Sequence, residues 1–333
     1  MVLPIERDVT GAAGRQPAPD PPLRLRDRVV LGLLSALTFA FERVSIDCAV
    51  ALGERLGRVW VRLGGPRTRR VREQLEAALP EQNVARRAVW KREVFIHLGR
   101  GLAELVLLRG RHRAALLDRV QVEGLEHLEA AERQTPSGGA LIVTAHLGNW
   151  ELASAKVAAI GVPISVVYRG LRQPALDRAM LGLRDAGPEP PGGAAAPELI
   201  PMGRAGIRLV RALEAGRKVV VALDQDARRE EGVFVSFFGR SASTRYGPIA
   251  LATQRGFPIL PAFMCRAPDG RTHRLQIQPA LQLEPGTSDD EEVLRRNVQR
   301  VTAVIEKEIR ACPGQWIWTH RRWRTRPTVV DRS

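Results

Sequence analysis

The sequence is short of cysteine, of lysine and of long apolar runs, and the first and last of these shortages each argue against a class of protein. Its 333 residues contain three cysteines, Cys48, Cys265 and Cys312, with no CxxC pair and no Cys/His spacing of a metal site. This odd and widely spaced set argues against a disulfide framework and a zinc site, and favours a reducing compartment. The first residues, Met1 to Pro22, lack the apolar stretch of a signal peptide and predict a flexible tail.

Acidic residues are also scarce relative to basic ones. Lys and Arg number 51 against 36 Asp and Glu, which gives a formal net charge of +15. Only four of the basic residues are lysines, Lys91, Lys156, Lys218 and Lys307. A GC-rich genome also produces such an arginine bias, but the charge itself favours an anionic partner. Membrane surfaces, phosphorylated lipids, nucleic acids and acidic carrier proteins are the candidate classes.

The longest uncharged run near the N-terminus is too short for a simple membrane span. Val29–Phe41 carries no charge and is followed by Glu42, Arg43 and a second apolar run, Val44–Gly53. As a helix the first run rises about 20 Å, against a hydrocarbon core of about 30 Å. A helix lying in the membrane interface needs no charge inside the bilayer, so we favour it. A buried helix and a span that tolerates Glu42 and Arg43 are the alternatives.

The rest of the chain changes from helical to alternating periodicity near residue 119. Residues 47–118 predict helices, among them Arg67–Leu79 and Val84–Leu108. Later apolar runs predict strands at Ala140–Ala145, Ile164–Tyr168, Lys218–Leu223, Ile259–Met264 and Leu275–Ile277. Helices are expected between them at about 149–160, 174–186, 204–215, 245–256 and 288–310, and a surface loop at Gly187–Pro197. We therefore predict a tail at 1–22, a helical segment at 23–118, and an α/β domain at 119–327 with a mixed sheet flanked by helices.

One stretch carries the pattern of a catalytic site. The apolar strand at Ala140–Ala145 is followed directly by His146, and Glu151 comes five residues later. A helix beginning near Asn149 places the glutamate in its first turn, where it can meet a histidine in the preceding turn. A carboxylate can then orient the imidazole, whose free nitrogen removes a proton from an alcohol. Gly148 is expected to let a substrate approach the backbone closely.

These residues resemble a known family. His146 to Glu151, read as His-Leu-Gly-Asn-Trp-Glu, is similar to the HxxxxE form of the HxxxxD/E motif of glycerolipid-type acyltransferases, and more narrowly to the lipid A biosynthesis late acyltransferases (the lauroyl/myristoyl acyltransferase family). Further blocks in the family's order are Val166–Arg169 with Leu176–Arg178, Ala222–Asp226, Gly232–Gly239 with Gly247–Pro248, and Gln315–Trp323 through Arg326–Pro327. The resemblance spans roughly residues 24–327.

The resemblance implies acyl transfer without a covalent acyl-enzyme. His146 would be the general base on the acceptor hydroxyl and Glu151 its supporting carboxylate. The donor would be acyl carrier protein or acyl-CoA, and the acceptor a lipid A precursor or a related glycolipid. The expected place is the cytoplasmic face of a bacterial inner membrane, with peripheral or monotopic attachment. Substrate contacts are expected from Asn149, Arg169, Asp224 and Asp226, and neither metal nor cofactor is expected.

Several alternatives remain open. The acceptor could be another membrane lipid, such as a phosphatidylinositol mannoside or an aminolipid, and Arg245, Tyr246 and the loop at Gly187–Pro197 depart from the family's pattern in ways that bear on it. No Glu-Gly-Thr-Arg-like phosphate-binding block is present, which counts against a lysophosphatidate acyltransferase. A non-catalytic relative that binds lipid or acyl carrier is a further alternative. The C-terminal tryptophans Trp316, Trp318 and Trp323 suit a membrane interface or the core, while a nucleic-acid partner is not expected.

Overall fold

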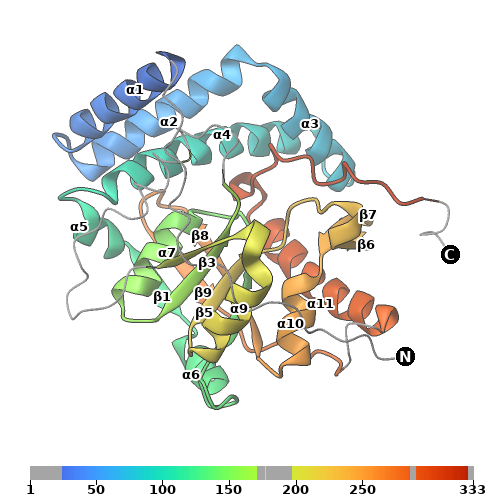
Figure 1. Ribbon diagram of the computed structural model, residues 1–333. Coiled ribbons are helices and arrows are strands. Elements are labelled where there is room, and N and C mark those ends of the chain that lie inside the picture. The colour runs from blue at the N-terminus through green and yellow to red at the C-terminus, as the bar shows by residue number, and fades with distance from the viewer. Residues whose placement is uncertain (1–24, 171–176, 178–196, 286–289, 329–333) are drawn as a thin grey trace.

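The computed structural model describes residues 25–170, 177, 197–285 and 290–328 (Figure 1). The tail predicted at 1–22, nearly all of the helix predicted at 174–186 and most of the loop predicted at Gly187–Pro197 lie outside the described residues.

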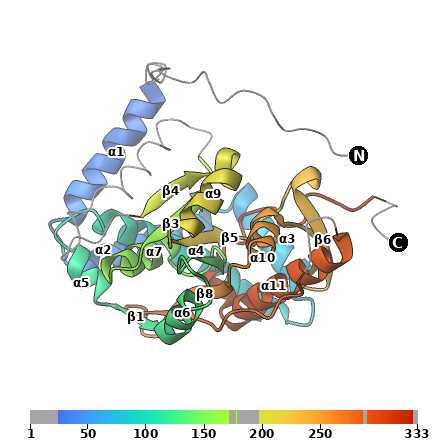
Figure 2. The same ribbon diagram turned by 60° about the horizontal axis from the view of Figure 1, so that its bottom comes forward.

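The N-terminal third is helical. It contains α1 (Leu25–Phe41), α2 (Ile46–Leu63), α3 (Pro66–Ala78), α4 (Val84–Leu107) and α5 (Arg113–Leu117). Ser45 accepts a hydrogen bond from the Cys48 amide and so caps α2, and Asn83 caps α4 in the same way through the Arg86 amide. Figure 1 shows α1, α2 and α4 stacked across one end of the molecule, and Figure 2 shows α1 projecting from it. None of the described helices combines the length and apolar content needed to cross a membrane.

Helices α2 and α4 pack through glycine. A Cβ on Gly53 of α2 would overlap the carbonyl of Gly99 on α4, and a Cβ on Gly99 would overlap the carbonyl of Gly53. The absence of side chains lets the two backbones approach closely. The inner face of α2 is therefore fixed firmly to α4, and its larger side chains point elsewhere.

The α/β part contains a seven-stranded sheet in the order β1-β9-β8-β2-β5-β3-β4. Its strands are β1 (Val120–Glu123), β2 (Ala140–Thr144), β3 (Ile164–Tyr168), β4 (Glu198–Pro201), β5 (Lys218–Ala222), β8 (Ile259–Arg266) and β9 (His273–Ile277). Neighbouring strands are parallel except for β8 and β9, which are antiparallel. The sheet is thus mixed, as predicted, and mainly parallel.

Helices cover both faces of the sheet (Figure 1). The side chains of Leu141, Val143, Val219 and Val221 pack in one core with α9 (Ala205–Glu214), α10 (Gly247–Gln254) and α11 (Glu291–Ala311). The other face meets α6 (Leu125–Glu132) and α7 (Trp150–Ala159). Two short strands and a hairpin were not predicted: β1, β4, and the pair β6 (Gly232–Phe237) and β7 (Arg240–Arg245). These strands are either very short or rich in polar residues, so their sequences show no clear strand pattern.

The expectation against a disulfide is wrong for one pair of cysteines. Cys265 on β8 is joined to Cys312 at the end of α11, with Cα atoms 7.1 Å apart, and Cys48 is free. The two partners are 47 residues apart in the chain. Only the packing of α11 beside the sheet brings them together, so spacing in the sequence gave no indication of the pair.

Candidate active site

His146 and Asp224 follow neighbouring parallel strands at the same edge of the sheet. Strand β2 ends at Thr144 and β5 ends at Ala222, and these two residues are partners in the strand register. The chain then turns, so that His146 and Asp224 each lie two residues beyond the end of their strand. The carboxyl ends of parallel strands are where open α/β sheets bind ligands. The α7 helix begins at Trp150 with Asn149 as its N-cap, which agrees with the predicted start.

The His146 ring is held by Asp224. Nδ1 of the imidazole lies 2.8 Å from Oδ1 of Asp224, and the backbone N–H of His146 donates to Oδ2 over 2.9 Å. The indole N–H of Trp316 donates to the same Oδ2 over 2.7 Å. With Asp224 accepting at Nδ1, Nε2 is the ring nitrogen suited to exchange a proton with a substrate.

Asp224 is a buried carboxylate that stays ionised. Its side chain is 0% exposed, whereas that of His146 is 25% exposed. Burial alone would raise the pKa of Asp224, but the charge of His146 and hydrogen bonds from His146 and Trp316 lower it to about 2. A fixed negative charge behind the ring stabilises an imidazolium on the exposed side.

Two further side chains surround the imidazole. The amide nitrogen of Gln225 lies 3.4 Å from both ring nitrogens of His146. The Trp150 ring meets the imidazole edge-on, with centroids 5.0 Å apart. Together with Asp224 they restrict the ring's rotation. Neither Gln225 nor Trp150 was expected at the site, although both stand beside residues that were.

The other predicted site residues lie around the same opening. Glu151, in the first turn of α7, lines the pocket and accepts a hydrogen bond from the Trp150 indole over 3.1 Å. Arg169 lines the same pocket and is exposed. Asp226 also lines it, and its carboxylate accepts bonds of 3.0 Å from the backbone N–H and the hydroxyl of Thr325. Asp226 therefore fastens the C-terminal segment beside the site.

Asn149 is buried and connects the active-site turn to α4. Its side-chain oxygen accepts from the Leu152 amide over 3.1 Å, and its nitrogen donates to Glu104 over 2.8 Å. Glu104 also receives two bonds from Arg266, of 2.6 and 2.7 Å, and lies 3.0 Å from Nε2 of His273. Burial alone would raise the pKa of Glu104, but His273 and Arg266 lower it. This buried cluster was not predicted, because its members are scattered over residues 104–273.

Gly148 and the C-terminal segment complete the turn. Gly148 has φ of 62°, and a Cβ there would clash with the carbonyl of Met264 on β8. Its missing side chain thus admits a neighbouring strand, whereas the sequence suggested close approach by a substrate. Gln315 accepts from the Gly148 amide over 3.2 Å, and the Ile317 amide donates to His146 over 3.2 Å. Trp316 and Trp318 are 1% and 0% exposed, so for these two the core alternative is correct.

The site opens into a deep, largely apolar pocket of about 890 Å³. His146, Trp150, Glu151, Arg169 and Gln225 are among the residues that line it. The pocket continues from them between α7 and the sheet, along side chains of β2, β3, β5, β8 and β9. Its volume is in the range of sites that enclose a ligand. Among the described residues no group of three or more His, Cys, Asp or Glu is placed to hold a metal ion.

Comparison with known proteins identifies the family of this chain. The sequence model described as "Bacterial lipid A biosynthesis acyltransferase" matches residues 22–325, which is most of the chain. The chain belongs to this family.

Individual relatives in the family agree with the assignment. The acyltransferase is similar to the lipid A biosynthesis palmitoleoyltransferase of Escherichia coli, with 29% identity over 83% of this chain and 85% of the relative. It is also similar to the lipid A biosynthesis lauroyltransferase of the same organism, with 27% identity over 84% of this chain and 86% of the relative. A phosphatidylinositol mannoside acyltransferase of Mycobacterium tuberculosis is 28% identical over 67% of this chain and 66% of its own length. The predicted family and enzyme class are therefore confirmed: the protein is an acyltransferase of the lipid A biosynthesis family.

Proposed function

We propose that this acyltransferase moves a fatty acyl chain from acyl carrier protein, or from acyl-CoA, to a hydroxyl of a lipid A precursor or a related glycolipid. His146 is the general base. The observation that carries the proposal is the contact of 2.8 Å between Nδ1 of His146 and the buried carboxylate of Asp224, at the mouth of a large apolar pocket.

The proposed reaction is a single displacement at the thioester carbonyl. Nε2 of His146 takes the proton of the acceptor hydroxyl as its oxygen attacks the carbonyl carbon of the donor. The tetrahedral intermediate collapses with cleavage of the carbon–sulfur bond, and the imidazolium returns its proton to the departing thiolate. The products are the acyl ester and the free thiol, and no bond to the protein forms.

Carboxylates on two sides support the charge on the ring. Asp224 holds the Nδ1 proton and stays ionised, so it stabilises the imidazolium directly. Glu151 remains in the catalytic set as a second carboxylate at the pocket mouth, where its charge favours the same state. Asn149 acts as a positioning residue through α7 and Glu104.

Arg169 is proposed to bind negative charge at the mouth. Its guanidinium is exposed, lines the pocket and offers several fixed donors. It is thus suited to the oxyanion of the tetrahedral intermediate or to a phosphate of the acceptor.

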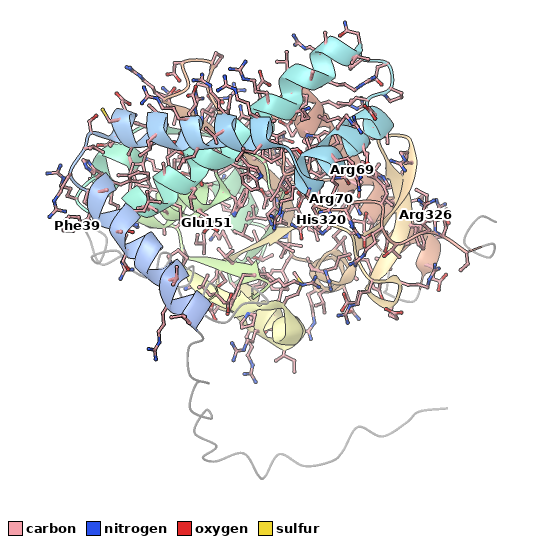
Figure 3. All side chains as sticks on the ribbon, turned by 90° about the horizontal axis from the view of Figure 1, so that it is seen from above. Phe39, Arg69, Arg70, Glu151, His320 and Arg326 are labelled. Carbon is pink, nitrogen blue, oxygen red and sulfur yellow. A yellow bond between two sulfur atoms is a disulfide. The ribbon has the colours of Figure 1, made fainter. Side chains whose placement is uncertain are left out.

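We further propose peripheral docking at the cytoplasmic face of the inner membrane through α1 and α2. Unlike a usual surface helix, α2 exposes large apolar side chains at helical spacing along one flank, beside the face that carries its glycines. They are Leu52, Leu56, Val59 and Leu63. Arg55 and Arg62 are exposed beside them, and on α1 Leu25, Val29 and Phe39 are exposed. Apolar side chains flanked by arginines suit an anionic lipid surface. Figure 3 labels Phe39 at the outer edge of these helices.

One side of the molecule is basic, which suits the binding of an acidic donor protein. In Figure 3, Arg69, Arg70 and Arg326 lie on the side that extends from Glu151 toward the C-terminal segment. Burial and the positive charges of Arg321 and Arg67 lower the pKa of Arg70, which is the mark of crowded cations. Electrostatic steering weakens as the Debye length falls from about 30 Å at 0.01 M to about 8 Å at 0.15 M salt.

The donor is tested with salt. We expect kcat/KM for acyl carrier protein to fall steeply as salt rises, mainly through KM, with the acceptor supplied in neutral micelles so that membrane binding does not contribute. Acyl-CoA, which is also anionic, is measured at the same salt concentrations. If acyl-CoA is the better donor throughout, the carrier-protein proposal fails while the chemistry at His146 stands.

The acceptor has a specific alternative. Similarity to a phosphatidylinositol mannoside acyltransferase favours a mannolipid as the second candidate. The deciding experiment incubates the enzyme with mixed acyl carrier protein thioesters and a membrane lipid extract, and identifies the acylated product by mass spectrometry. The variant His146→Ala is the control. A folded wild type that acylates no lipid, or a product that also forms with His146→Ala, would refute the proposed reaction.

A further inference from the structure

The C-terminal segment, residues 316–328, lies between α3 and the catalytic turn and contains no helix and no ladder of strand pairs. Its one β-type contact is an isolated bridge between Leu147 and Trp316. Figure 1 shows the segment in red beside α3. Buried backbone N–H and C=O groups need hydrogen-bond partners. Side chains from other elements therefore have to supply the partners that a helix or a sheet would otherwise give.

On one side the segment holds the catalytic groups. The indole N–H of Trp316 donates to the Asp224 carboxylate over 2.7 Å, and the Ile317 amide donates to the carbonyl of His146 over 3.2 Å. Trp316 is 1% exposed, so its indole is enclosed by the core. A shift of this part of the segment would therefore move the carboxylate relative to the imidazole that it holds.

On the other side the segment is held by one side chain of α3, that of Gln74. Its nitrogen Nε2 donates to the carbonyl oxygens of Trp318 and His320. Its oxygen Oε1 accepts from the backbone N–H of Arg322 over 3.0 Å. Gln74 is buried, and its two N–H donors and its oxygen all bind the segment. Carbonyls only accept and an amide N–H only donates, so the partners also fix the orientation of the carboxamide.

A second side chain of α3 adds to this contact. Arg70, one helical turn before Gln74, donates to the carbonyl of Thr319 over 3.0 Å. The two side chains share a face of α3 because they are four residues apart. Together they bind backbone groups of residues 318–320 and 322, directly after Trp316 and Ile317.

We propose that Gln74 is a positioning residue for catalysis: by clamping the C-terminal segment to α3, it places Trp316 and thereby holds the Asp224 carboxylate against His146. This inference rests on the proposed role of His146 as the general base. Gln74 does not line the pocket, so it acts on the reaction only through the segment.

A positioning role differs measurably from a purely structural one. If Gln74 only stabilised the fold, its loss would reduce the amount of folded protein but leave the folded enzyme's chemistry unchanged. If it positions Asp224, its loss also weakens the counter-charge at the imidazole, so the ring gains a proton at lower pH. Other titratable or charged groups near the ring are Glu151 on α7, Arg169 after β3, Asp226 after β5, and His320 and Arg322 in the segment. Asp224 contacts the ring directly, so its displacement should dominate the change.

Two variants break the proposed path at different points. Gln74→Met keeps the length of the side chain but removes all three hydrogen bonds to the segment. Trp316→Phe keeps an aromatic ring but removes the N–H that binds Asp224, and it leaves the clamp intact. Gln74→Asn, whose shorter carboxamide stays polar, is a milder version of the first variant and should act in the same direction.

Asn297→Leu is the matched control. Asn297 on α11 is 3% exposed, and its carboxamide also fastens non-helical backbone. Its oxygen accepts from the amide of Glu284 over 2.8 Å, and its nitrogen donates to the carbonyl of Glu284 over 2.9 Å. These bonds join α11 to the chain before it and involve neither the C-terminal segment nor the catalytic turn. The control should lose stability without any change in kcat.

Steady-state kinetics give the first measurement. We expect kcat to fall about ten- to 100-fold in Gln74→Met and in Trp316→Phe, with little change in either KM, because a displacement of about 1 Å suffices for such a loss. The double variant should lose about as much as the worse single variant, because both changes act through the same contact. Losses that multiply in the double variant would contradict a shared path.

The second measurement needs no turnover and so separates this inference from the proposed function. The pH titration of the His146 ring is followed by NMR through its Cε1 proton, which is assigned by its absence in His146→Ala. The midpoint should move to lower pH by about one unit in Gln74→Met and Trp316→Phe, and should stay at the wild-type value in Asn297→Leu. Such a shift supports the clamp even if no lipid is acylated. A wild-type midpoint in folded Gln74→Met or Gln74→Asn, or in Trp316→Phe, would overturn it, whatever the activity at His146.

Discussion

Nδ1 of His146 lies 2.8 Å from Oδ1 of Asp224, although 78 residues separate the two in the chain. A partner of the imidazole thus lies just beyond the end of the neighbouring strand β5, and partners need not be sought only in α7, the helix that follows His146. Asp224, which sequence reasoning assigned to substrate contacts, is the buried carboxylate that fixes the ring.

The first prediction concerns this pair. His146→Ala removes the proposed general base and should lower kcat by about 100- to 10,000-fold. Asp224→Asn keeps the shape but removes the charge, so kcat should fall much more than acceptor KM changes. Glu151→Gln should also lower kcat, and comparing the three by steady-state kinetics ranks the two carboxylates. If kcat of folded His146→Ala falls by less than about tenfold, the assignment of His146 as the general base is wrong.

The second prediction is a pH dependence of stability set by His97. This buried histidine is next to Arg266, Glu104 and His273, and burial, followed by the charge of Arg266, lowers its pKa from 6.5 to about 4. Between these values the unfolded chain binds a proton that the folded chain does not. The free energy of unfolding should therefore fall as pH decreases from about 6.5 to about 4, by at most about 3 kcal/mol.

Urea unfolding of wild type and His97→Gln across this range measures the contribution. The variant should be less stable at neutral pH but should lose less stability on acidification. If both proteins show the same slope between pH 6.5 and 4, His97 is not the responsible group.

The third prediction concerns the buried cluster around Glu104. Glu104→Gln leaves the guanidinium of Arg266 buried without a full counter-charge, which typically costs about 3–5 kcal/mol. It also weakens the bond to Asn149, so kcat should fall in the protein that remains folded. Glu292→Gln is the control, because Glu292 makes exposed ion pairs with Arg295 and Arg296 on the surface of α11 and should cost less than about 1 kcal/mol. Equal melting temperatures for the two variants would contradict the role of the cluster.

The fourth prediction separates close packing from backbone strain at the active-site turn. Gly148 and Gly161 both have positive φ, 62° and 89°, but only at Gly148 would a Cβ meet another chain segment, the carbonyl of Met264. Gly161→Ala should cost about 1 kcal/mol and preserve kcat. Gly148→Ala should displace the turn that carries His146 and lower kcat at least tenfold. Similar kinetics in the two variants would show that the close approach to β8 is unimportant.

The fifth prediction tests membrane docking by α2. Leu56 and Val59 are about half exposed on the flank of α2, beside the face that carries its glycines. The double variant Leu56→Asp/Val59→Asp should reduce flotation with vesicles that contain phosphatidylglycerol, while activity toward a micellar acceptor stays near normal. Val84→Asp is the control, since Val84 is 75% exposed at the start of α4, away from this face. Flotation unchanged by the double variant would place the membrane contact elsewhere.

The sequence by itself determined the α/β class, the main strands and the start of α7, and it singled out the histidine that we propose as the general base. These depend on local periodicity, on a capping residue and on a motif of six consecutive residues, all of which act over a few turns of chain. The family followed from the order of several such blocks, because their order is a property of the chain and needs no contact between them.

Only the tertiary structure decided which groups meet. Asp224 reaches His146 because β2 and β5 are adjacent and parallel, and Glu104 reaches Asn149 because α4 packs beside the start of α7. The pairing of Cys265 with Cys312 and the burial of Trp316 depend on packing in the same way. Such contacts join residues that are tens to hundreds of positions apart. Their free energy exists only once strands and helices have taken their places, so no local pattern encodes them.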